Sequence, residues 1–384
     1  MRVGEPSPEP LKVSLLAPTR ERCGIGEYSR LLAQALASLP AIATVYRIST
    51  PEAATRTGTR AALQSFLPDE RRFYALGESL NAGNVAHIQH QYFFFGGVAP
   101  HKNHFRALLN AVRVPLVLTV HEIASGGTSG WKRALIALSN RRNFLHPAIR
   151  QVVVHTQADA LKLRILGVPE ARLTVLPVAV PPTVGLPDRD AARAALGVGG
   201  KQVLLMFGFL SAKKGHLLAL EALTQLPEDC LLIFAGERHP HDSSDYVTRL
   251  RASVAAHGLE ERVLFTGYLP ADRIPGVMAA ADVALAPFTE SSGSASLAHL
   301  LAYGLSVVAS DIPPHRELLS QSPGSLLLFP NGNAAALAQA LHALRQDRSL
   351  SASLKLAAGQ VAAERSFAYL AGETLALYRK AIAG

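Results

Sequence analysis

Short apolar runs alternate with longer segments of helical periodicity along most of the chain, and this alternation restricts the folds that it can adopt. In the first half, the runs that we predict as strands cover residues 12–17, 43–48, 85–89, 115–120, 151–155 and 173–176. Helical patterns lie between several of them, including residues 25–39 and 158–166. Strands that alternate with helices typically form a parallel sheet with helices on both faces. The first half therefore predicts an α/β, doubly wound domain.

The same alternation starts again after residues 177–188, which hold four prolines and one glycine, have no helical period and are typical of a linker. Predicted strands then cover 203–207, 231–235, 263–266, 283–286, 307–310 and 325–329, and predicted helices cover 217–226, 246–256, 334–344, 354–362 and 369–382. We predict two Rossmann-like domains at 1–180 and 181–384, with the last helix packed back on the first domain. Because open parallel sheets bind ligands at the carboxyl ends of their strands, we expect the site in an interdomain cleft.

Composition excludes several classes of protein. With 49% hydrophobic and 17% charged residues, the chain has ample material for folded cores and is not of a disordered type. Its two cysteines, Cys23 and Cys230, lie 207 positions apart, so neither a disulfide scaffold nor a cysteine zinc cage is expected. No apolar run reaches the ~20 residues of a membrane span, and residues 1–10 do not lead into a signal-peptide core. We therefore expect a cytoplasmic protein.

Positive charge is concentrated in the first half. Residues 1–180 hold 21 Lys and Arg against 11 Asp and Glu, a balance of +10, whereas residues 181–384 hold 17 against 18, a balance of −1. This asymmetry favours an anionic partner, such as a membrane or an anionic acceptor, with a surface that only confers solubility as the alternative. Residues 131–145 combine Trp131 with four cations and no acid, which suits either an interfacial helix at the inner face of the membrane or a surface helix packed on the core. No nucleic-acid recognition module is evident, so we expect no nucleic-acid partner.

The chain has 14 histidines, which raises the question of a zinc site. His87 and His90 differ by an odd number on a predicted strand, so they point to opposite faces. His101 and His104 can share a helix face, but no third ligand accompanies them, and a zinc site needs at least three protein ligands. We therefore predict no metal.

A glycine-containing segment, Gly24-Ile25-Gly26, follows the first predicted strand and opens the first helix. Glycines allow a ligand to approach the backbone, and the N–H groups of a helix start face an anion. A third glycine is missing and the next strand ends near Arg47 rather than at an acid, which disfavours a nicotinamide dinucleotide. The segment is either a ligand-facing turn or only a tight turn between strand and helix.

Two later strands of the first half end in polar residues. One reads Val-Ala-His-Ile-Gln-His-Gln over residues 85–91, with Phe-Gly-Gly shortly after it, and the other ends in Thr-Val-His-Glu at residues 119–122. Together with the glycine turn, these motifs resemble the N-terminal domain of the family-4 retaining glycosyltransferases of GT-B fold. The resemblance implies that His121 lies beside the donor sugar, as a sugar-binding or charge-stabilising residue. Gln91 stands where many members have Glu on the acceptor side.

In the second half, residues 207–216 read Phe-Gly-Phe-Leu-Ser-Ala-Lys-Lys-Gly-His and lead from a strand into a helix. They resemble the family motif G-R-L-x-x-x-K-G, in which Arg and Lys hold the donor diphosphate. Lys214 aligns with the family lysine, and Phe209 occupies the arginine position, so Lys213 is the candidate for the second positive charge. A lysine in a glycine-flanked loop is a reasonable diphosphate ligand on charge grounds, and a solvated pair of loop lysines is the alternative.

Residues 286–311 follow the family's block of a Glu, a Gly-containing turn, a helix with a second Glu and a closing A-x-G-x-P-V-V-A-S. The turn 291–294 precedes a predicted helix, so free N–H groups and serine hydroxyls form an anion seat there. Counted back from Gly304, the two family glutamates fall on Ser291 and His299. Glu290, one place away, then serves as the sugar-facing carboxylate, and His299 either bonds the ribose or is an ordinary buried histidine.

The resemblance implies a metal-independent hexosyl- or related transferase that moves a sugar, with retention, from a nucleotide-diphosphate sugar to an acceptor hydroxyl in polysaccharide, glycolipid or other glycoconjugate synthesis. No cofactor is expected besides this co-substrate. The predicted catalytic residues are His121, Lys214 and Glu290. The predicted substrate-binding residues are Gly24, Ile25, Gly26, Gln91, Gly208, Lys213, Gly236, Tyr268, Leu269, Ser292, Gly293, Ser294, Ala295, Ser296 and His299. A catalytically inactive sugar-nucleotide-binding protein and a GT-B epimerase are the alternatives.

Overall fold

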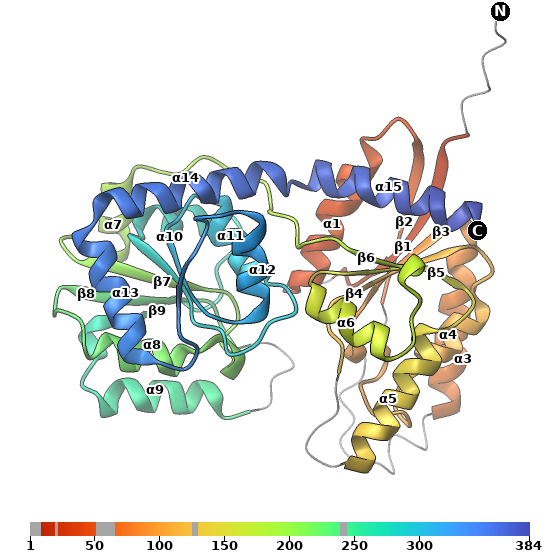
Figure 1. Ribbon diagram of the computed structural model, residues 1–384, viewed down its shortest axis with the longest axis horizontal. Helices are drawn as coiled ribbons and strands as arrows, with labels where there is room; N and C mark the ends of the chain where they lie inside the picture. Colours follow the sequence, from red (N-terminus) through yellow and green to blue (C-terminus); the bar gives the residue numbers. More distant parts are fainter. Residues whose placement is uncertain (1–8, 20–21, 51–65, 125–129, 239–243) are drawn as a thin grey trace, which may run out of the picture. The chain divides into compact units, whose positions relative to one another are not determined.

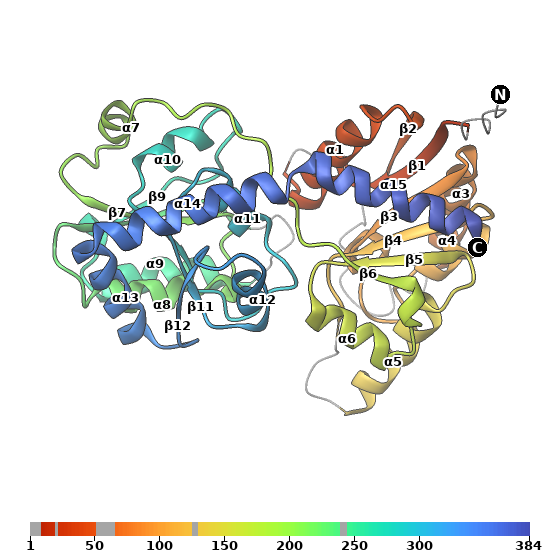
Figure 2. The same ribbon diagram turned by 45° about the horizontal axis from the view of Figure 1, so that its top comes forward.

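The computed structural model describes residues 9–19, 22–50, 66–124, 130–238 and 244–384. The chain divides into two compact units, the first formed by residues 1–177 with 367–384 and the second by residues 178–366 (Figures 1 and 2). The first segment of the first unit ends at Pro177, three residues before the predicted boundary at 180. The segment after it belongs to the second unit because the N–H of Val180 donates to the carbonyl of Arg365 at 2.7 Å. The last helix belongs to the first unit.

The first unit contains a parallel six-stranded sheet in the order β2-β1-β3-β4-β5-β6. Its strands are β1 (Leu11–Ala17), β2 (Ile42–Ser49), β3 (Val85–His90), β4 (Leu116–Val120), β5 (Ile149–Val154) and β6 (Leu173–Val175). Its α-helices are α1 (Gly24–Ala37), α3 (Phe66–Ser79), α4 (Phe105–Ala111), α5 (Gly130–Phe144), α6 (Gln157–Ile165) and α15 (Phe367–Ala383), with 3-10 turns η1 (Leu80–Ala82), η2 (Tyr92–Phe95) and η3 (Glu170–Arg172).

Helices cover both faces of this sheet (Figure 1). On one face, α1 packs against α15, and α15 packs on β3, β4 and β5. On the other, α3, α4, α5 and α6 enclose a core in which Phe105, Phe144 and Leu108 are buried against the strands. The prediction that His101 and His104 share a helix face is wrong, since α4 begins only at Phe105, and the His104 ring stacks on Phe73 with centroids 5.2 Å apart.

The second unit contains a second parallel six-stranded sheet in the order β12-β11-β10-β7-β8-β9. Its strands are β7 (Gln202–Phe207), β8 (Cys230–Ala235), β9 (Val263–Phe265), β10 (Val283–Ala286), β11 (Val307–Ser310) and β12 (Leu327–Phe329). Its helices are α7 (Arg189–Leu196), α8 (His216–Leu223), α9 (Tyr246–Ala256), α10 (Ile274–Ala280), α11 (Ala295–Ala302), α12 (Pro313–Gln321), α13 (Ala334–Gln346) and α14 (Arg348–Glu364), with 3-10 turns η4 (Ala212–Lys214) and η5 (Glu260–Arg262).

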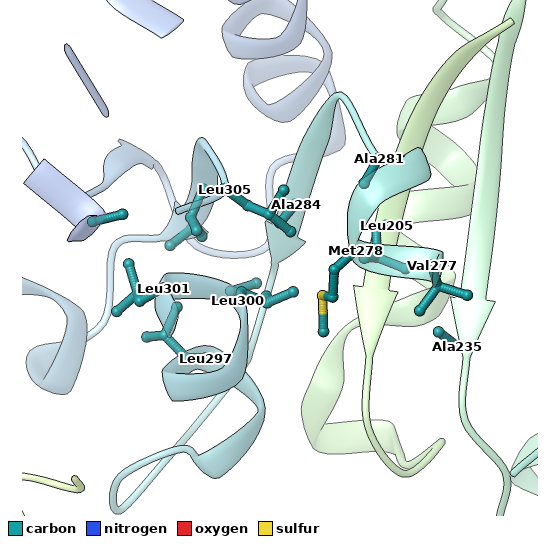
Figure 3. Close-up of a cluster of buried hydrophobic side chains, with 14 of the residues drawn as sticks. Leu205, Ala235, Val277, Met278, Ala281, Ala284, Leu297, Leu300, Leu301 and Leu305 are labelled. Carbon is teal, nitrogen blue, oxygen red and sulfur yellow. The ribbon is translucent and has the colours of Figure 1, made fainter. Parts of the chain in front are cut away.

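Successive residues of β7 enter different cores, as expected for a strand that is covered on both faces. Val203 and Leu205 join the core under α7, α10 and α11, where Met278 fills the space between helix and sheet (Figure 3). Leu204 and Met206 join the core under α8, α9 and α13. The prediction of two doubly wound parallel α/β domains is thus confirmed.

Candidate functional site

The carboxyl ends of β7, β8 and β10 bring three loops of the second unit together. The N–H of Gly208, which follows β7, donates to the carbonyl of Ala235 at 2.9 Å, and a Cβ at Gly236 would lie 2.1 Å from the carbonyl oxygen of Gly208. The N–H of Thr289, after β10, donates to the carbonyl of Lys213 at 2.9 Å. Predicted site residues from all three loops are therefore neighbours.

Two glycines make this close approach possible. Gly208 has φ +109°, and a Cβ there would lie 2.2 Å from Ser296 Oγ. Gly215 has φ +73°, and its Cβ would lie 2.0 Å from the carbonyl oxygen of Pro287. L-residues rarely adopt such φ values, and no side chain fits in these spaces. Glycine at both positions allows the loop after β7 to pack closely against the segment between β10 and α11.

Lys214 points its ammonium at the start of α11. Its Nζ donates to Ser296 Oγ at 2.8 Å and to Ser294 Oγ at 3.4 Å, and it lies 4.1 Å from the centre of the Phe288 ring. Burial lowers the pKa of Lys214 to about 7. Among the described residues, no carboxylate forms an ion pair with it. This cation is therefore held by neutral groups alone.

The first turn of α11 offers further hydrogen-bond donors next to Lys214. Ser294 is its N-cap, since its Oγ accepts from the N–H of Leu297 at 3.1 Å. Within the described part of the chain, the N–H groups of Ala295 and Ser296 have no acceptor, as is usual for the first turn of a helix. Ser292 and Gly293, which has φ +114°, form the turn before it. An ammonium, two hydroxyls and the N–H groups of a helix start are together suited to an anion.

Lys213 and Glu290 pair with each other at the rim of these loops. Their Nζ and Oε1 atoms are 2.9 Å apart, and both side chains are more than half exposed. Because its charge is met by Glu290, Lys213 is less suited than Lys214 to hold a diphosphate. His299 donates from Nδ1 to the carbonyl of Ala295 at 2.8 Å, and its ring lies 5.2 Å from that of Phe207. In the neutral ring, Nε2 is then a hydrogen-bond acceptor. It offers the same kind of group as the carboxylate oxygen of the glutamate that the resembling family has at this position.

Tyr268 and Leu269 follow β9 and therefore lie at the same edge of the sheet as the loops around Lys214. Gly267 before them has φ +70°, which turns the chain after the strand. The side chain of Leu269 packs against the core, whereas Tyr268 is 36% exposed. Tyr268 is therefore a surface residue rather than part of the core.

In the first unit, His121 follows β4 and belongs to a chain of buried hydrogen bonds. His155 Nδ1 donates to the carbonyl of Leu176 at 2.9 Å, so the neutral His155 ring accepts at Nε2 from His121 Nδ1, 3.2 Å away. His121 Nε2 lies 2.7 Å from Gln89 Oε1. Burial holds the pKa of His121 well below its usual value, so the ring is neutral. Because its Nδ1 donates to His155, its Nε2 has to accept, which requires the Gln89 amide to be rotated by about 180° so that its N–H₂ group takes the place of Oε1.

The same chain continues from Gln89 to α15. His87 Nε2 lies 3.3 Å from Gln89 and 2.8 Å from Thr119 Oγ1, and Tyr378 donates its hydroxyl to His87 Nδ1 at 2.8 Å. Burial lowers the pKa of His87 to about 3, so it is neutral. Each bond of this chain then has one donor and one acceptor. Both ring nitrogens of His121 are engaged within the unit.

Glu122 is a candidate site residue that the sequence patterns did not single out. Gln91 donates from Nε2 to Glu122 Oε2 at 2.7 Å. Gln91 stands where a carboxylate is typical of the resembling family, and the structure places a carboxylate beside it from the next strand. The signal was present in the Thr-Val-His-Glu ending of β4, in which only the histidine was singled out.

Gly24, Ile25 and Gly26 form the first turn of α1, after Cys23 as the N-cap residue, which makes no side-chain cap. A Cβ at Gly24 would meet no atom within 4 Å, so packing does not require glycine there. Tyr28, two residues after Gly26, directs its ring edge-on toward His121 and His155, with centroids 5.6 and 5.8 Å away. The glycine turn and the histidine chain are thus joined through α1.

No group of three His, Cys, Asp or Glu side chains in the described ranges is arranged to hold a metal ion. His87 contacts Tyr378 of α15, whereas His90 packs among Phe95, Phe105 and Phe144 on the other face of the sheet. The triplet Asp188-Arg189-Asp190 has the D-x-D form of a metal motif, but Asp188 is the N-cap of α7 and accepts from the N–H of Ala191 at 2.9 Å.

The helix α5, which covers most of residues 131–145, is largely exposed. Trp131, Leu135 and Leu138 are 65%, 47% and 55% exposed, and only Asn140, Asn143 and Phe144 of this helix are buried. The adjoining α6, which contacts α5 where Arg141 Nη1 donates to the carbonyl of Leu166, adds exposed Leu161 and Ile165. Only the C-terminal end of α5 packs on the core, so the choice between an interfacial helix and a surface helix stays open. In the described parts of the chain, no helix is long and apolar enough to cross a membrane.

Comparison with known proteins identifies the fold, and a family model matches part of the chain. HepE of Anabaena, solved in complex with UDP-glucose, superposes with a TM-score of 0.71 at 20% identity over 96% of this chain and all of its own. Sucrose-phosphate synthase of Thermosynechococcus elongatus gives 0.75 at 18% identity over 97% and 99%. The chain therefore has the GT-B fold, as predicted. Residues 188–361 match the model of the family "Glycosyl transferases group 1", so most of the second unit is similar to that family.

Sequence relatives cover less of the chain. The 2-deoxystreptamine glucosyltransferase of Streptomyces kanamyceticus is 29% identical over 226 residues, which are 56% of this chain and 57% of that protein. The alpha-D-kanosaminyltransferase of the same organism is 23% identical over 280 residues, or 70% and 71% of the two chains. The chain thus spans little more than half the length of the first of these relatives.

Proposed function

We propose that this protein transfers a sugar from a nucleotide-diphosphate sugar to an acceptor hydroxyl, in the synthesis of a polysaccharide, glycolipid or other glycoconjugate. The observation that carries the proposal is the Lys214 ammonium, which is half-buried, has no carboxylate partner among the described residues and points at the open N–H groups of α11. A cation that is partly withdrawn from water without a counterion is costly, and an anion at this place would offset the cost. The diphosphate of a donor has the required charge.

The proposed chemistry needs these groups to act on the leaving diphosphate. As the bond between the anomeric carbon and the diphosphate oxygen breaks, its electron pair goes to that oxygen, and Lys214 and the N–H groups of Ala295 and Ser296 stabilise the charge. The acceptor oxygen forms the new bond on the same face of the sugar, with retention, and its proton passes to the diphosphate. Glu290 and His299 are proposed to hold the donor by accepting from its hydroxyls.

The first unit is proposed to supply the acceptor side. Gln91 and Glu122 offer a hydrogen-bonded amide and carboxylate at the ends of β3 and β4. His121 is proposed to lie beside the donor sugar, and its ring is able to contact a sugar hydroxyl only after the bond to Gln89 opens. The glycine turn Gly24–Gly26 adds backbone N–H groups. The names of the relatives, glucosyl- and kanosaminyltransferases, support a sugar as the transferred group.

A panel of UDP-, GDP- and ADP-sugars tests the proposal. A donor that binds only the native state raises the melting temperature, and the shift grows with its concentration. We expect one nucleotide class to stabilise the wild type more than Lys214→Ala, and expect transfer to an acceptor or slow hydrolysis of that donor. Binding without any turnover would favour the inactive sugar-nucleotide-binding protein, and conversion of the donor into an epimer would favour the epimerase. No shift with any donor would contradict all three functions.

We further propose that the reaction is independent of metal ions, because Lys214 and the start of α11 supply the positive charge that a divalent cation supplies elsewhere. Turnover is therefore expected to continue in EDTA at the rate without it. Loss of activity in EDTA that Mg²⁺ or Mn²⁺ restores would contradict metal independence and leave the transferase proposal standing.

The exposed surface of α5 and α6 supports a further proposal, a peripheral contact with an anionic membrane on which the acceptor lies. It combines apolar side chains with Lys132, Arg133, Arg141 and Arg142, and α5 contains no acid. This composition suits the interface of a bilayer with anionic lipids.

Sedimentation with vesicles tests the membrane contact. We expect binding to vesicles with anionic lipid at low salt, none to neutral vesicles, and loss of binding in Lys132→Glu with Arg133→Glu. The variant Arg249→Glu with Arg273→Glu makes the same change of charge in the second unit and is expected to bind normally. Failure of the wild type to sediment would overturn the contact in favour of a surface that only confers solubility.

A further inference from the structure

A polar pocket lies at the opposite edge of the second sheet from Lys214. Its volume is about 510 Å³, and its walls come from the amino ends of β7, β8 and β10 and from the junction of α13 and α14. It is lined by Gly200, Lys201, Gln202, Asp229, Asp282, Val283, Leu344, Arg345, Arg348, Ser351, Ala352 and Lys355. The six residues of β7 alone separate it from the Lys214 loop by roughly 17 Å.

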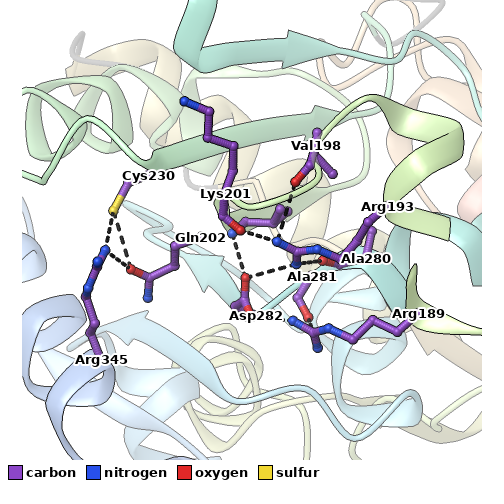
Figure 4. A network of polar contacts seen from close by, with 11 residues as sticks. Arg189, Arg193, Val198, Lys201, Gln202, Cys230, Ala280, Ala281, Asp282 and Arg345 are labelled. Carbon is purple, nitrogen blue, oxygen red and sulfur yellow. Dashed lines mark hydrogen bonds and ion pairs between the residues drawn. The ribbon is translucent and has the colours of Figure 1, made fainter. Parts of the chain in front are cut away.

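Both carboxylates of this pocket are already neutralised. Asp229 receives two hydrogen bonds from Arg345, at 2.8 and 2.7 Å, in a bidentate pair. Asp282 accepts from Arg189, from Arg193 at 3.3 Å and from the N–H of Val203 at 2.7 Å (Figure 4). No carboxylate charge is left over for any other cation of the pocket.

Three cations of the pocket have no such partner. Among the described residues, the side chains of Lys201, Arg348 and Lys355 form no ion pair and no hydrogen bond. The charge of Lys201 nevertheless contributes, after the larger effect of Arg345, to lowering the pKa of Asp229. The second half of the chain has a balance of −1, so three uncompensated cations around one hollow are a local concentration. Their mutual repulsion is relieved by an anion.

The side chains, and not the helix start, make this pocket anion-binding. The first turn of α14 is occupied by Asp347, whose Oδ1 accepts from the N–H groups of Ser349 and Leu350 at 2.9 and 3.0 Å. One guanidinium and two ammonium groups remain, which is the donor set that binds phosphate groups. No aromatic ring lines the pocket, so it offers no surface on which a nucleobase stacks. Its volume falls within the usual range for small-molecule sites.

We propose that this pocket is a second, separate site for a small phosphorylated anion without an aromatic base, such as a sugar phosphate or inorganic pyrophosphate. The site is distinct from the one proposed for the donor diphosphate, and it stands whether or not the protein transfers sugars. Both edges of the second sheet then bind phosphate groups: the carboxyl edge through a half-buried lysine and a helix start, and the amino edge through exposed side chains.

Titration of the full chain with inorganic pyrophosphate, at constant ionic strength, tests this site. All variants carry Lys214→Ala, so that binding at the carboxyl edge is weakened. We expect this background to bind pyrophosphate still, and the further change Arg348→Gln with Lys355→Gln to weaken binding at least tenfold. Arg249→Gln with Arg273→Gln removes the same charge elsewhere in the second unit and is the control, expected to bind as the background does.

The amide NMR signals of Lys201 and Ser351 locate the ligand, since they are expected to shift in the background and not in the Arg348→Gln, Lys355→Gln variant. The same titration with a hexose phosphate, compared with pyrophosphate, shows which of the two proposed ligand classes binds the pocket more tightly. Absence of binding in the Lys214→Ala background, or equal weakening in the pocket variant and the control, would overturn the second site.

Discussion

The two units of this protein share one architecture and differ in how the polar groups at their strand ends are satisfied. In the first unit, His87, Gln89, His121 and His155 bond to one another in a buried chain. In the second, Lys214 bonds only to hydroxyls, and the helix start beside it keeps open N–H groups. The sheet architecture is the same in both units and therefore does not indicate which of them binds a charged ligand. An excess of hydrogen-bond donors over acceptors at the strand ends favours an anion, and this excess occurs in the second unit.

The largest expected difference between the two units is the loss of folding stability at low pH. Burial lowers the pKa of His87 and His90 to about 3, below the value of ~6.5 in the unfolded chain. The unfolded state therefore binds more protons below pH 6.5, so the stability that these neutral rings provide is present above pH 6.5 and is lost as the pH falls toward 3. We expect each of the two to cost about 2 kcal/mol at pH 5. His121 and His155 act in the same direction.

Hydrogen exchange at pH 7 and pH 5, corrected for intrinsic rates, measures this loss in each unit separately. The second unit contains His216 and His315, whose pKa values burial lowers to about 3 and about 4, so it is expected to lose less protection than the first. His87→Gln removes one titrating ring and is expected to flatten the pH dependence of the first unit, whereas His257→Gln, at an exposed position, leaves it unchanged. Equal losses in the two units would break the comparison.

The next effect concerns turnover. Charge develops on the diphosphate as the glycosidic bond breaks, so a cation there stabilises the transition state more than the bound donor. Lys214→Ala is expected to lower kcat by roughly a hundredfold or more, with a smaller loss of donor affinity. Lys213→Ala, at a lysine that is paired with Glu290, is the matched control and is expected to change kcat little. A larger effect at Lys213 than at Lys214, in folded proteins, would move the diphosphate role to Lys213.

Donor affinity is expected to depend on pH through the same lysine. Burial lowers the pKa of Lys214 to about 7 in the empty site, and a bound diphosphate would raise it, so binding takes up a proton above pH 7. Affinity is therefore expected to fall roughly tenfold between pH 7 and pH 8.5, since one pKa unit corresponds to 1.36 kcal/mol. Calorimetry in buffers of different ionisation enthalpy counts the protons. A dependence that persists in Lys214→Ala would assign the titration to another group.

The smallest effect compares two helix caps. Ser294 Oγ accepts from the N–H of Leu297 at 3.1 Å, and Thr156 Oγ1 accepts from the N–H of Asp159 at 3.1 Å. Replacement by Ala at either position is expected to lower the free energy of unfolding by about 1 kcal/mol. Only Ser294→Ala is expected also to weaken donor binding, because only its helix start faces Lys214. Denaturant titrations and donor titrations of both variants check this. Equal donor affinities would show that Ser294 caps the helix but does not contribute to donor binding.

Strands that are buried on both faces were predictable to within a few residues. The predicted 283–286 matches β10, and 203–207 falls one residue short of β7, because continuous apolar runs are typical of such strands. Helix starts were less predictable. The predicted 354–362 covers only the second half of α14, since the cap that begins it, Asp347, lies before an apolar pattern that is weak at first.

The candidate site was predictable only where its residues are close in sequence. Lys214 and the turn before α11 were found from local motifs, because a glycine-flanked lysine and a serine cap are short patterns. The partners of His121 were not, since His155 lies 34 residues away and Tyr378, at the far end of the chain of bonds, lies 291 residues from His87. Such contacts depend on register between strands and on the return of α15, which no local pattern encodes. The carboxylate of Glu122 follows His121 directly in a motif that was found, but its contact with Gln91 depends on the register of β3 and β4 and was missed.

The return of α15 to the first unit also sets the order in which the chain can complete its folding. The strands β1–β6 are made first, but the helix that covers one of their faces follows the 189 residues of the second unit, 178–366. At synthesis rates of ~5–20 residues per second, that face waits roughly 10–40 s for its cover. Nascent chains stalled before residue 367 are expected to bind hydrophobic dyes and chaperones more strongly than chains released after α15, and equal binding would show that another segment covers the face meanwhile.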